Sequence, residues 1–295
     1  MKHYAVKAAV MASMAAISLG AQAQTLIGLT TSNELVSLSG TTFSMPVAIT
    51  GLASGEKLLG IDLRPSNGLT YAISDQNRLY TVNTTTGVAT LAANLTGASF
   101  AATGGIGIDF NPQADLNGAA SLRVTTGTGK NYAVNVATGA VGNTSNNISA
   151  GNTGVAYTNS APGLDPRMGA ADVTDLYYIN TATDSLNLAL DSFNTPTITQ
   201  VGTGLGIGID VLSANGFEIF GFTGKAFAAL NIDDGTGRTG IYSIDLVTGK
   251  AVSVTTYNGT LVGLTAAVPE PETYALMLAG LGALGVVARR RRKQA

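Results

Sequence analysis

The feature that most constrains the fold of this chain is an internal repeat of about 45 residues. One phrase has the frame aromatic-x-aliphatic-Asn/Asp, two variable residues, then Thr-Gly or Thr-Asp. It recurs as LYTVNTTTGVATL at 79–91, YAVNVATGAV at 132–141, LYYINTATDSL at 176–186 and IYSIDLVTGKAV at 241–252, with a fainter copy, LVSLSGTTFSM, at 35–45. The alternation predicts a half-buried strand, and the Asn-x-x-Thr-Gly element predicts a hairpin turn closed by glycine. Each copy therefore predicts two short strands joined by a tight turn.

A second phrase precedes the first by about 20 residues. Its copies are GIDLRPSNGLTYAIS at 60–74, GIDFNPQADLNGAASLRV at 107–124 and GIDVLSANGFEIFG at 208–221, with a degenerate GVAYTN at 154–159. Asn67-Gly68, Asn117-Gly118 and Asn215-Gly216 inside these copies predict further hairpins. Four short strands in each repeat unit are typical of a β-propeller blade.

The repeats predict an all-β fold over residues 24–267, a β-propeller of five four-stranded blades. The segment from Thr25 aligns with the segment from Leu69 at an offset of 44, so the mature chain is expected to begin at the second strand of a blade. TLVGLTAA at 260–267 resembles the missing first strand. We therefore expect the N- and C-terminal strands to pair and close the ring. A β-sandwich and an open β-solenoid are the structural alternatives.

The N-terminal segment, residues 1–23, has the pattern of a secretory signal peptide. Lys2 and Lys7 precede an apolar stretch, and Ala21-Gln22-Ala23 forms an A-x-A cleavage site. The mature chain is expected to start at Gln24.

The C-terminal segment, residues 268–295, has three parts. Pro269-Glu270-Pro271 comes first, and an apolar run from Tyr274 to Ala288 follows. As a helix this run would span about 22 Å, enough for a short transmembrane helix in a locally thinned bilayer. The positive-inside rule keeps the closing cations on the cytoplasmic side, and these are Arg289, Arg290, Arg291, Arg292 and Lys293.

This order of a Pro-Glu-Pro motif, an apolar helix and an arginine run resembles the PEP-CTERM sorting signal of Gram-negative bacteria. The resemblance implies export, anchorage in the inner membrane by the tail, and processing near Pro269-Glu270-Pro271 by an exosortase-type enzyme. The mature protein would then be at the cell surface or extracellular, in a system that accompanies exopolysaccharide production. A plain tail anchor without such processing is the alternative.

The body of the chain also resembles an uncharacterised bacterial domain of unknown function. The phrases that carry the resemblance are at Leu58 to Ala72, Leu79 to Thr90 and Ile108 to Asp115. It supports the β-rich fold, but it transfers no chemistry.

The composition of residues 24–268 excludes several function classes. Sixteen Asp and Glu against nine Lys and Arg give a net charge of −7, which argues against nucleic acid as a partner. The chain has no Cys, and its one His, His3, lies in the leader. Ser-His-Asp and Cys-His catalysis, the usual zinc sites and haem ligation therefore each lack an essential group. Carboxylate, Lys or Tyr chemistry and metal sites with oxygen ligands remain.

Three aspartates, Asp62, Asp109 and Asp210, close the Gly-Ile-Asp element in three repeats and are expected at one mouth of the central channel. As a functional set they would support glycoside hydrolysis or hold calcium. As structural residues, each would cap the turn before its next strand. Their repetition favours the structural interpretation, because catalysis requires one asymmetric pair of carboxylates.

Two loops contain oxygen ligands suited to calcium, although neither has the EF-hand frame. One holds Asp233 and Asp234 in the sequence Asp-Asp-Gly-Thr-Gly; the other holds Asp109, Asn111, Asp115 and Asn117. Ordinary polar turns are the alternative at both places. Calcium is thus the one cofactor that the sequence leaves open, and we otherwise expect none.

The sequence favours a non-enzymatic surface or extracellular-matrix protein, a binding or structural module associated with exopolysaccharide. The alternative is a carboxylate-dependent, polysaccharide-active enzyme with its site at the propeller mouth. Two carboxylates about 5 to 9 Å apart in an open pocket would favour the enzyme. Aspartates that each bond their own turn would favour the scaffold.

Overall fold

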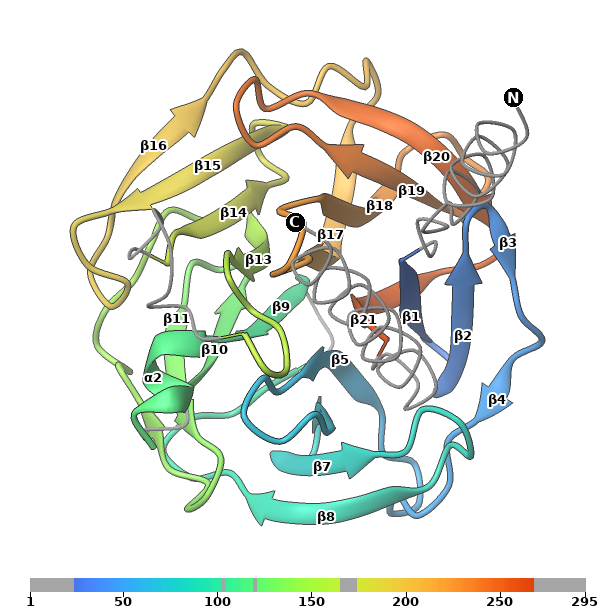
Figure 1. The fold of residues 1–295 in the computed structure, drawn as a ribbon, viewed down its shortest axis with the longest axis vertical. Coiled ribbons are helices and arrows are strands. Elements are labelled where there is room, and N and C mark those ends of the chain that lie inside the picture. The colour runs from blue at the N-terminus through green and yellow to red at the C-terminus, as the bar shows by residue number, and fades with distance from the viewer. Residues whose placement is uncertain (1–23, 102–103, 119–120, 165–173, 268–295) are drawn as a thin grey trace, which may run out of the picture.

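The computed structural model describes residues 24–101, 104–118, 121–164 and 174–267. Five antiparallel sheets stand around one central axis, so the chain forms a five-bladed β-propeller (Figure 1). The predicted signal peptide at 1–23 and the predicted sorting segment at 268–295 lie outside the described residues. Among the helices that the structure describes, none is long and apolar enough to cross a membrane.

In each blade, the innermost strand lies at the axis and the other strands follow outward. The first blade contains β21 (Leu261–Ala266), β1 (Thr25–Thr30), β2 (Glu34–Ser39), β3 (Thr42–Phe43) and β4 (Val47–Ala48). The second contains β5 (Leu58–Leu63), β6 (Thr70–Ser74), β7 (Arg78–Val82) and β8 (Ala89–Asn94). The third contains β9 (Ile106–Phe110), β10 (Ser121–Thr126), β11 (Asn131–Asn135) and β12 (Val141–Gly142), with the short helix α2 (Pro112–Leu116) between β9 and β10. The fourth contains β13 (Asn152–Tyr157), β14 (Leu176–Asn180), β15 (Ser185–Leu190) and β16 (Thr197–Val201). The fifth contains β17 (Val211–Ile219), β18 (Ala226–Ile232), β19 (Thr239–Ile244) and β20 (Ala251–Tyr257).

The ring is closed by the first and last strands of the described chain. β21 pairs antiparallel with β1, with Leu26 opposite Ala266 and Gly28 opposite Leu264. β21 also packs between β17 and β5, the inner strands of the neighbouring blades. The predicted pairing of the terminal strands is therefore confirmed, and a closed cycle of inner strands excludes both the sandwich and the open solenoid.

The repeated Asn-x-x-Thr-Gly phrase forms the predicted turn between the third and fourth strands. In the second blade, Asn83 Oδ1 accepts hydrogen bonds from the amides of Thr85 and Thr86 at 3.0 and 2.9 Å. Gly87 closes the turn with a φ of 73°. The same arrangement recurs in the turns Asn135–Gly139 and Asp245–Gly249.

In the fourth blade, the copy of this phrase is one strand out of frame. Asn180 ends β14, the second strand of its blade rather than the third. Its Oδ1 accepts from the amide of Ala182 at 2.9 Å, and Asp184, at a φ of 45°, takes the place of the closing glycine. The predicted strand, turn and strand are therefore present in this blade, but they are its second and third strands rather than its third and fourth. The repeat does not distinguish the two positions, because second and third strands share the same alternation of aromatic and aliphatic residues.

The expectation that Gly208-Ile209-Asp210 is equivalent to the other two Gly-Ile-Asp elements, with Asp210 at the mouth of the channel, was wrong, because these residues do not form the inner strand of the fifth blade. These residues precede β17, and Asp210 is exposed. Asn215-Gly216, predicted to be a hairpin turn, lies inside β17 instead. The hairpin is at Phe220–Lys225, where Phe220 N donates to Lys225 O at 2.9 Å.

Apolar side chains fill the space between adjacent blades. Each inner strand contributes one such residue, the third from its end, and each is at most 5 % exposed: Ile61, Ile108, Val155, Phe217 and Leu264. Burial of one such side chain contributes about 1.5–3 kcal/mol. This packing fixes the spacing of the inner strands and therefore the geometry of the axis.

Candidate functional site

Each of the five inner strands has a glycine three residues before its end. A Cβ atom at Gly107 would lie 2.3 Å from the carbonyl oxygen of Thr153 in the next blade. One at Gly216 would lie 2.5 Å from the Cβ atom of Leu264, also in the next blade. The inner strands therefore come so close at the axis that these two positions leave no room for a side chain. The full set is Gly60, Gly107, Gly154, Gly216 and Gly263.

Two residues after each glycine, the penultimate residue of the strand lies against the inner strand of the next blade. These five residues are Asp62, Asp109, Ala156, Glu218 and Thr265. The edge of an inner strand that faces the axis has no neighbouring strand in its own sheet. The backbone N–H groups on that edge therefore need hydrogen-bond acceptors from elsewhere. The four polar members of the set supply them.

Each of these four side chains accepts a hydrogen bond from a backbone N–H of the next inner strand. The pairs are Asp62 Oδ2 with Phe110 N at 2.7 Å, Asp109 Oδ1 with Tyr157 N at 3.2 Å, Glu218 Oε2 with Ala266 N at 2.9 Å and Thr265 Oγ1 with Leu63 N at 3.0 Å. The Thr265 hydroxyl also donates to Asp62 Oδ1 at 3.0 Å. The polar residues thus connect neighbouring blades around the axis.

Three of the four polar side chains form a carboxylate cluster, which we define as Asp62, Asp109 and Glu218. One carboxylate oxygen from each lies within 4.8 Å of the others. The three residues are buried, at 3 %, 1 % and 3 % exposure. Each of the three is the penultimate residue of its inner strand, so the cluster lies at the end of the axis where the inner strands finish.

Burial is the main cause of shifted pKa values in the carboxylate cluster. It raises the pKa of the Glu218 carboxyl to about 7. Burial, followed by the charge of Glu218, raises the pKa of Asp62 well above its ordinary value. Burial and the charges of Asp62 and Glu218 do the same for the pKa of Asp109. Three carboxylates this close cannot all stay ionised near neutral pH, so they must share protons or bind a cation.

The structure brings Asp62 and Asp109 together as expected, but it does not bring Asp210 to them. Asp210 is exposed in the segment before β17, where its carbonyl oxygen accepts from Asp233 N at 2.9 Å. Glu218 takes the third place in the cluster, and sequence reasoning missed it. The signal was present: Gly216-Phe217-Glu218 has the same Gly-aliphatic/aromatic-acid pattern as the other two copies.

The turn caps predicted for Asp62 and Asp109 are made by other residues. Asn67 Oδ1 accepts from Leu69 N at 3.0 Å in the turn after β5. Asn111 is the N-cap of α2, and its Oδ1 accepts from Gln113 N at 3.0 Å. The two aspartates are therefore free to bond the next blade.

Two acidic residues of the predicted loop calcium sites, Asp234 and Asp115, are already bonded to other residues. Asp234 Oδ1 accepts from the hydroxyl and the amide of Thr236 at 2.6 and 2.9 Å, and these bonds lower the pKa of its exposed carboxyl. Asp233, also exposed, lies beside it between β18 and β19. In the other loop, buried Asp115 pairs with Arg64 at 2.7 Å, while Asn117 is the C-cap of α2. Within the described residues, only the carboxylate cluster gathers three acidic ligands.

The geometry of the cluster suits bonding between blades better than glycoside hydrolysis. Hydrolysis with a pair of carboxylates requires an accessible site with space between them for the sugar and, in inverting enzymes, a water molecule. In this protein each carboxylate is almost fully buried and already accepts a backbone hydrogen bond. A proton or a hard cation such as calcium fits a cluster of this kind.

Comparison with known families gives two matches along the chain. Residues 37–265 match a family described as a domain of unknown function, DUF4394. Residues 267–293 match the PEP-CTERM protein-sorting motif. The curated proteins contain no match to this chain.

Solved structures resemble the chain at the level of the fold. Regucalcin from Agrobacterium tumefaciens, described as a calcium-binding protein, is 17 % identical, with 84 % of this chain and 71 % of that chain covered and a TM-score of 0.42. A putative 6-phosphogluconolactonase from Bacteroides fragilis is 10 % identical, with 81 % and 83 % covered and a TM-score of 0.42. At such identities and TM-scores, the likeness carries no conclusion about ligand or activity.

Proposed function

Because this chain belongs to the DUF4394 family and carries a PEP-CTERM sorting motif, we propose that it is an exported, non-enzymatic module that binds or organises extracellular material. The closed ring of five sheets gives the module a compact body with loops at both ends of its axis. Exopolysaccharide is the partner we propose, because the sorting motif resembles those of systems that accompany exopolysaccharide production. The acidic body makes nucleic acid a poor partner.

The proposed export route uses both ends of the chain. The signal peptide, residues 1–23, would be removed before Gln24, after the Ala21-Gln22-Ala23 site. The helix from Tyr274 to Ala288 would hold the protein in the inner membrane until an exosortase-type enzyme acts near Pro269-Glu270-Pro271. The position of the last strand supports this order, because β21 ends at Ala266 and the sorting motif begins at residue 267. Processing would therefore leave every blade intact.

One observation carries the non-enzymatic part of the proposal: the axial carboxylates hold blades together. Asp62, Asp109 and Glu218 each use an oxygen to accept from a backbone N–H of the next blade. A catalytic acid or base must instead reach a substrate proton in an accessible site. The polysaccharide-active enzyme predicted as the alternative is therefore less well supported.

The test uses the folded body, residues 24–267, which contains the complete ring. The purified protein is incubated with polysaccharide from the native matrix, and both its retention and the number of new reducing ends are measured. We expect retention without new reducing ends. New reducing ends that disappear in Asp109→Asn would overturn the proposal and support the enzyme.

We also propose the carboxylate cluster as the place where this chain takes up calcium. Its three buried carboxylates provide the oxygen ligands that calcium prefers, and a divalent cation would relieve their repulsion. The loop of Asp233 and Asp234 lacks this concentration of charge.

At pH 7.5, calcium should raise the thermal midpoint of residues 24–267 relative to a chelator, and Asp109→Asn should abolish the shift. An equal shift in Asp109→Asn would place the calcium elsewhere.

A further inference from the structure

The last strand of the ring fixes where the predicted membrane anchor leaves the folded body. β21 is an inner strand, and it finishes at the end of the axis that holds the carboxylate cluster, which we call the cluster end. Its final residue is Ala266, and Ala267 N donates to Thr25 O at 2.9 Å. The chain beyond residue 267, which includes the predicted helix from Tyr274 to Ala288, is therefore attached at the cluster end.

The N-terminus of the mature chain lies at the same end. Gln24 Nε2 donates to Thr223 Oγ1 at 2.6 Å, in the turn between β17 and β18. This turn follows the inner strand β17, so it belongs to the cluster end. The predicted signal peptide directly precedes Gln24. Both predicted membrane segments are thus joined to the same face of the propeller.

The linker between β21 and the predicted helix is short compared with the body. Residues 267–273 separate Ala266 from Tyr274, and a fully extended chain of this length reaches at most about 29 Å. A compact domain as long as the ring has a radius of roughly 23 Å. To turn the opposite end of the axis toward the bilayer, the linker would have to pass around the rim, a path longer than its reach. The anchor therefore holds the cluster end toward the membrane.

The loops at the cluster end expose large apolar side chains. Three loops that leave an inner strand each expose one such residue: Leu69 after β5, Leu116 in α2 and Phe222 after β17. Their exposed fractions are 48 %, 40 % and 61 %. The described turns that join second to third strands, at the opposite end, contain no exposed large apolar residue. Apolar side chains are thus placed where the anchor brings the bilayer.

The distribution of charge also favours the cluster end as the membrane face. In the described loops between inner and second strands, charges balance: Arg64 and Lys225 against Asp115 and Asp175. The described turns between second and third strands carry more acids than bases: Asp75, Asp184, Asp233 and Asp234 against Lys130 and Arg238. An anionic bilayer surface attracts bases and repels acids, so it repels the cluster end less than the opposite end.

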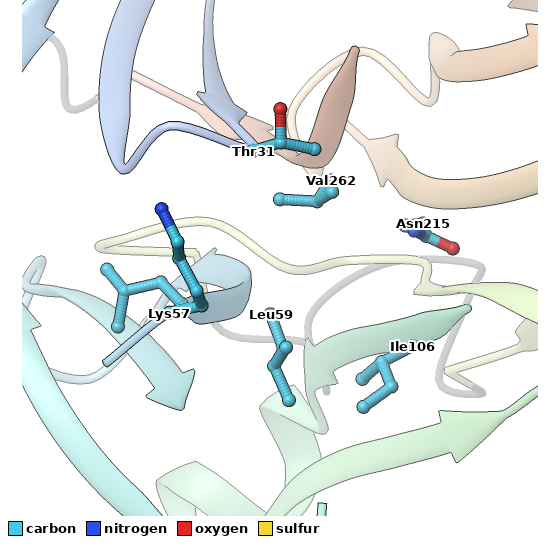
Figure 2. Close-up of a pocket in the computed structure, with 7 residues that line it drawn as sticks. Thr31, Lys57, Leu59, Ile106, Asn215 and Val262 are labelled. Atoms are coloured by element: carbon cyan, nitrogen blue, oxygen red, sulfur yellow. The ribbon is translucent and has the colours of Figure 1, made fainter. Parts of the chain in front are cut away.

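The opposite end of the axis holds the pocket shown in Figure 2, which has a volume of about 130 Å³. Leu59, Ile106 and Val262 line it, and each lies near the start of its inner strand. When the cluster end faces the membrane, this end faces away from it. The pocket end is then the one that meets extracellular material while the protein is anchored.

We propose that the cluster end is a membrane-binding face, on which Leu69, Leu116 and Phe222 enter the head-group region of the bilayer while the C-terminal helix anchors the protein. Apolar side chains gain free energy at the boundary between head groups and acyl chains. The phospholipid surface is the partner because the linker holds it close to these loops. This inference rests on the anchor of the proposed export route and adds which face of the propeller touches the membrane.

The test uses tryptophan fluorescence, because the chain contains no tryptophan. The mature chain, residues 24–295, is reconstituted into vesicles of phosphatidylethanolamine and phosphatidylglycerol whose acyl chains carry bromine near the head group, which quenches tryptophan on contact. Phe222→Trp reports on the cluster end. Leu212→Trp, near the start of the same strand β17 and 58 % exposed, is the matched control for the opposite end. We expect quenching of Phe222→Trp and none of Leu212→Trp.

Two results of this experiment would overturn the proposal. Equal fluorescence of Phe222→Trp in brominated and unbrominated vesicles would mean that this face does not lie on lipid, which would leave a protein of the native membrane as its partner. Quenching of Leu212→Trp in place of Phe222→Trp would mean that the opposite end faces the bilayer.

A charged substitution tests the apolar contact itself. In the Phe222→Trp chain, Leu69→Asp should reduce the quenching, because a carboxylate is unfavourable in the boundary region of an anionic bilayer. Val252→Asp, on the outer strand β20 and 63 % exposed, should leave the quenching unchanged. Equal quenching in these two variants would count against the membrane face.

Extraction of the vesicles with alkaline carbonate separates this inference from the proposed export route. If the mature chain is washed off, the predicted anchor is wrong, and the export route and this inference are both overturned. If the chain stays in the bilayer while Phe222→Trp is not quenched, the anchor stands and only the membrane-binding face is overturned.

Discussion

At the scale of single residues, glycine at five equivalent positions sets how closely the inner strands approach the axis. The constraint is steric rather than conformational at Gly107 and Gly216, because the added Cβ atom would meet backbone or Cβ atoms of the next blade. Backbone atoms held in a closed ring cannot move aside at low cost. These glycines are therefore required for the packing of the inner strands, as the apolar side chains of the core are.

We predict that Gly107→Ala lowers the free energy of unfolding by about 1–3 kcal/mol, the usual cost of overpacking. The Cβ atom would lie 2.3 Å from Thr153 O and 3.0 Å from Val155 N. Urea denaturation of residues 24–267 measures the change. The control is Gly142→Ala on the outer strand β12, where the nearest atom, Ala133 O, is 3.4 Å away. Equal stability of the two variants would contradict the steric argument.

The carboxylate cluster makes a second prediction at this scale, in the absence of calcium. The Glu218 carboxyl has a pKa near 4.5 when exposed and about 7 in the fold, so between these values the folded state binds more protons than the unfolded state. Stability should therefore fall as pH rises from 4.5 to 7, by at most about 3 kcal/mol from this group. Denaturation midpoints at pH 5 and pH 8, with a chelator present, measure the loss.

Glu218→Gln is the matched variant for the pH prediction. The amide keeps an acceptor for Ala266 N but does not titrate, so the variant should lose less stability between pH 5 and pH 8 than the wild type. It should also be the more stable protein at pH 8. Parallel pH profiles for the two proteins would show that Glu218 does not titrate in this range.

At the scale of the element, β21 is the strand that closes the ring. Its six residues are the inner strand of the first blade, the partner of β1 and the neighbour of β5 and β17. The hydroxyl of Thr265, inside β21, also accepts from Leu63 N and donates to Asp62 Oδ1. A strand that joins three blades in this way determines whether the ring is closed or open.

We predict that a chain ending at Thr260 does not unfold cooperatively, because the ring is open and the axial edge of β1 has lost its partner. Thermal unfolding followed by circular dichroism, together with limited proteolysis, measures the effect. A chain that ends at Ala267 retains β21 and serves as the control. A cooperative transition at a similar midpoint in both chains would mean that closure by β21 is dispensable.

At the scale of the whole molecule, the folded body and the sorting signal are adjacent but separate in sequence. The last backbone hydrogen bond of the ring is from Ala267 N to Thr25 O at 2.9 Å, and the sorting match starts at this same residue. Folding of the body and processing of the tail should therefore be independent. This separation makes the sorting proposal testable without disturbing the propeller.

We predict that replacement of Pro269, Glu270 and Pro271 by alanine changes the mature size or the release of the protein and leaves its thermal midpoint unchanged. Immunoblots of cell and medium fractions from the native host measure processing and release. A control triple replacement at Thr223, Gly224 and Lys225, in the exposed β17–β18 turn, should leave processing unchanged. Normal processing of the first variant would defeat exosortase-type sorting and favour a plain tail anchor.

The sequence by itself determined the features that depend on short-range patterns. Alternation of residues predicted the strands, and Asn-x-x-Thr-Gly predicted turns such as Asn83–Gly87, because an Asx side chain and a glycine close these turns locally. The constant offset between the segments at Thr25 and Leu69 predicted ring closure, because it shows that the first repeat lacks one strand and the last segment supplies it.

Only the tertiary structure decided which acidic residues meet at the axis. Gly208-Ile209-Asp210 and Gly216-Phe217-Glu218 both fit the repeated motif, and local pattern cannot choose between them. The choice is made by packing: Gly216 can lie against Leu264 of β21, and Phe217 fills the space between blades. Contacts between residues far apart in sequence depend on the closed ring, so the partners of Asp62 become evident only once all five blades are in place.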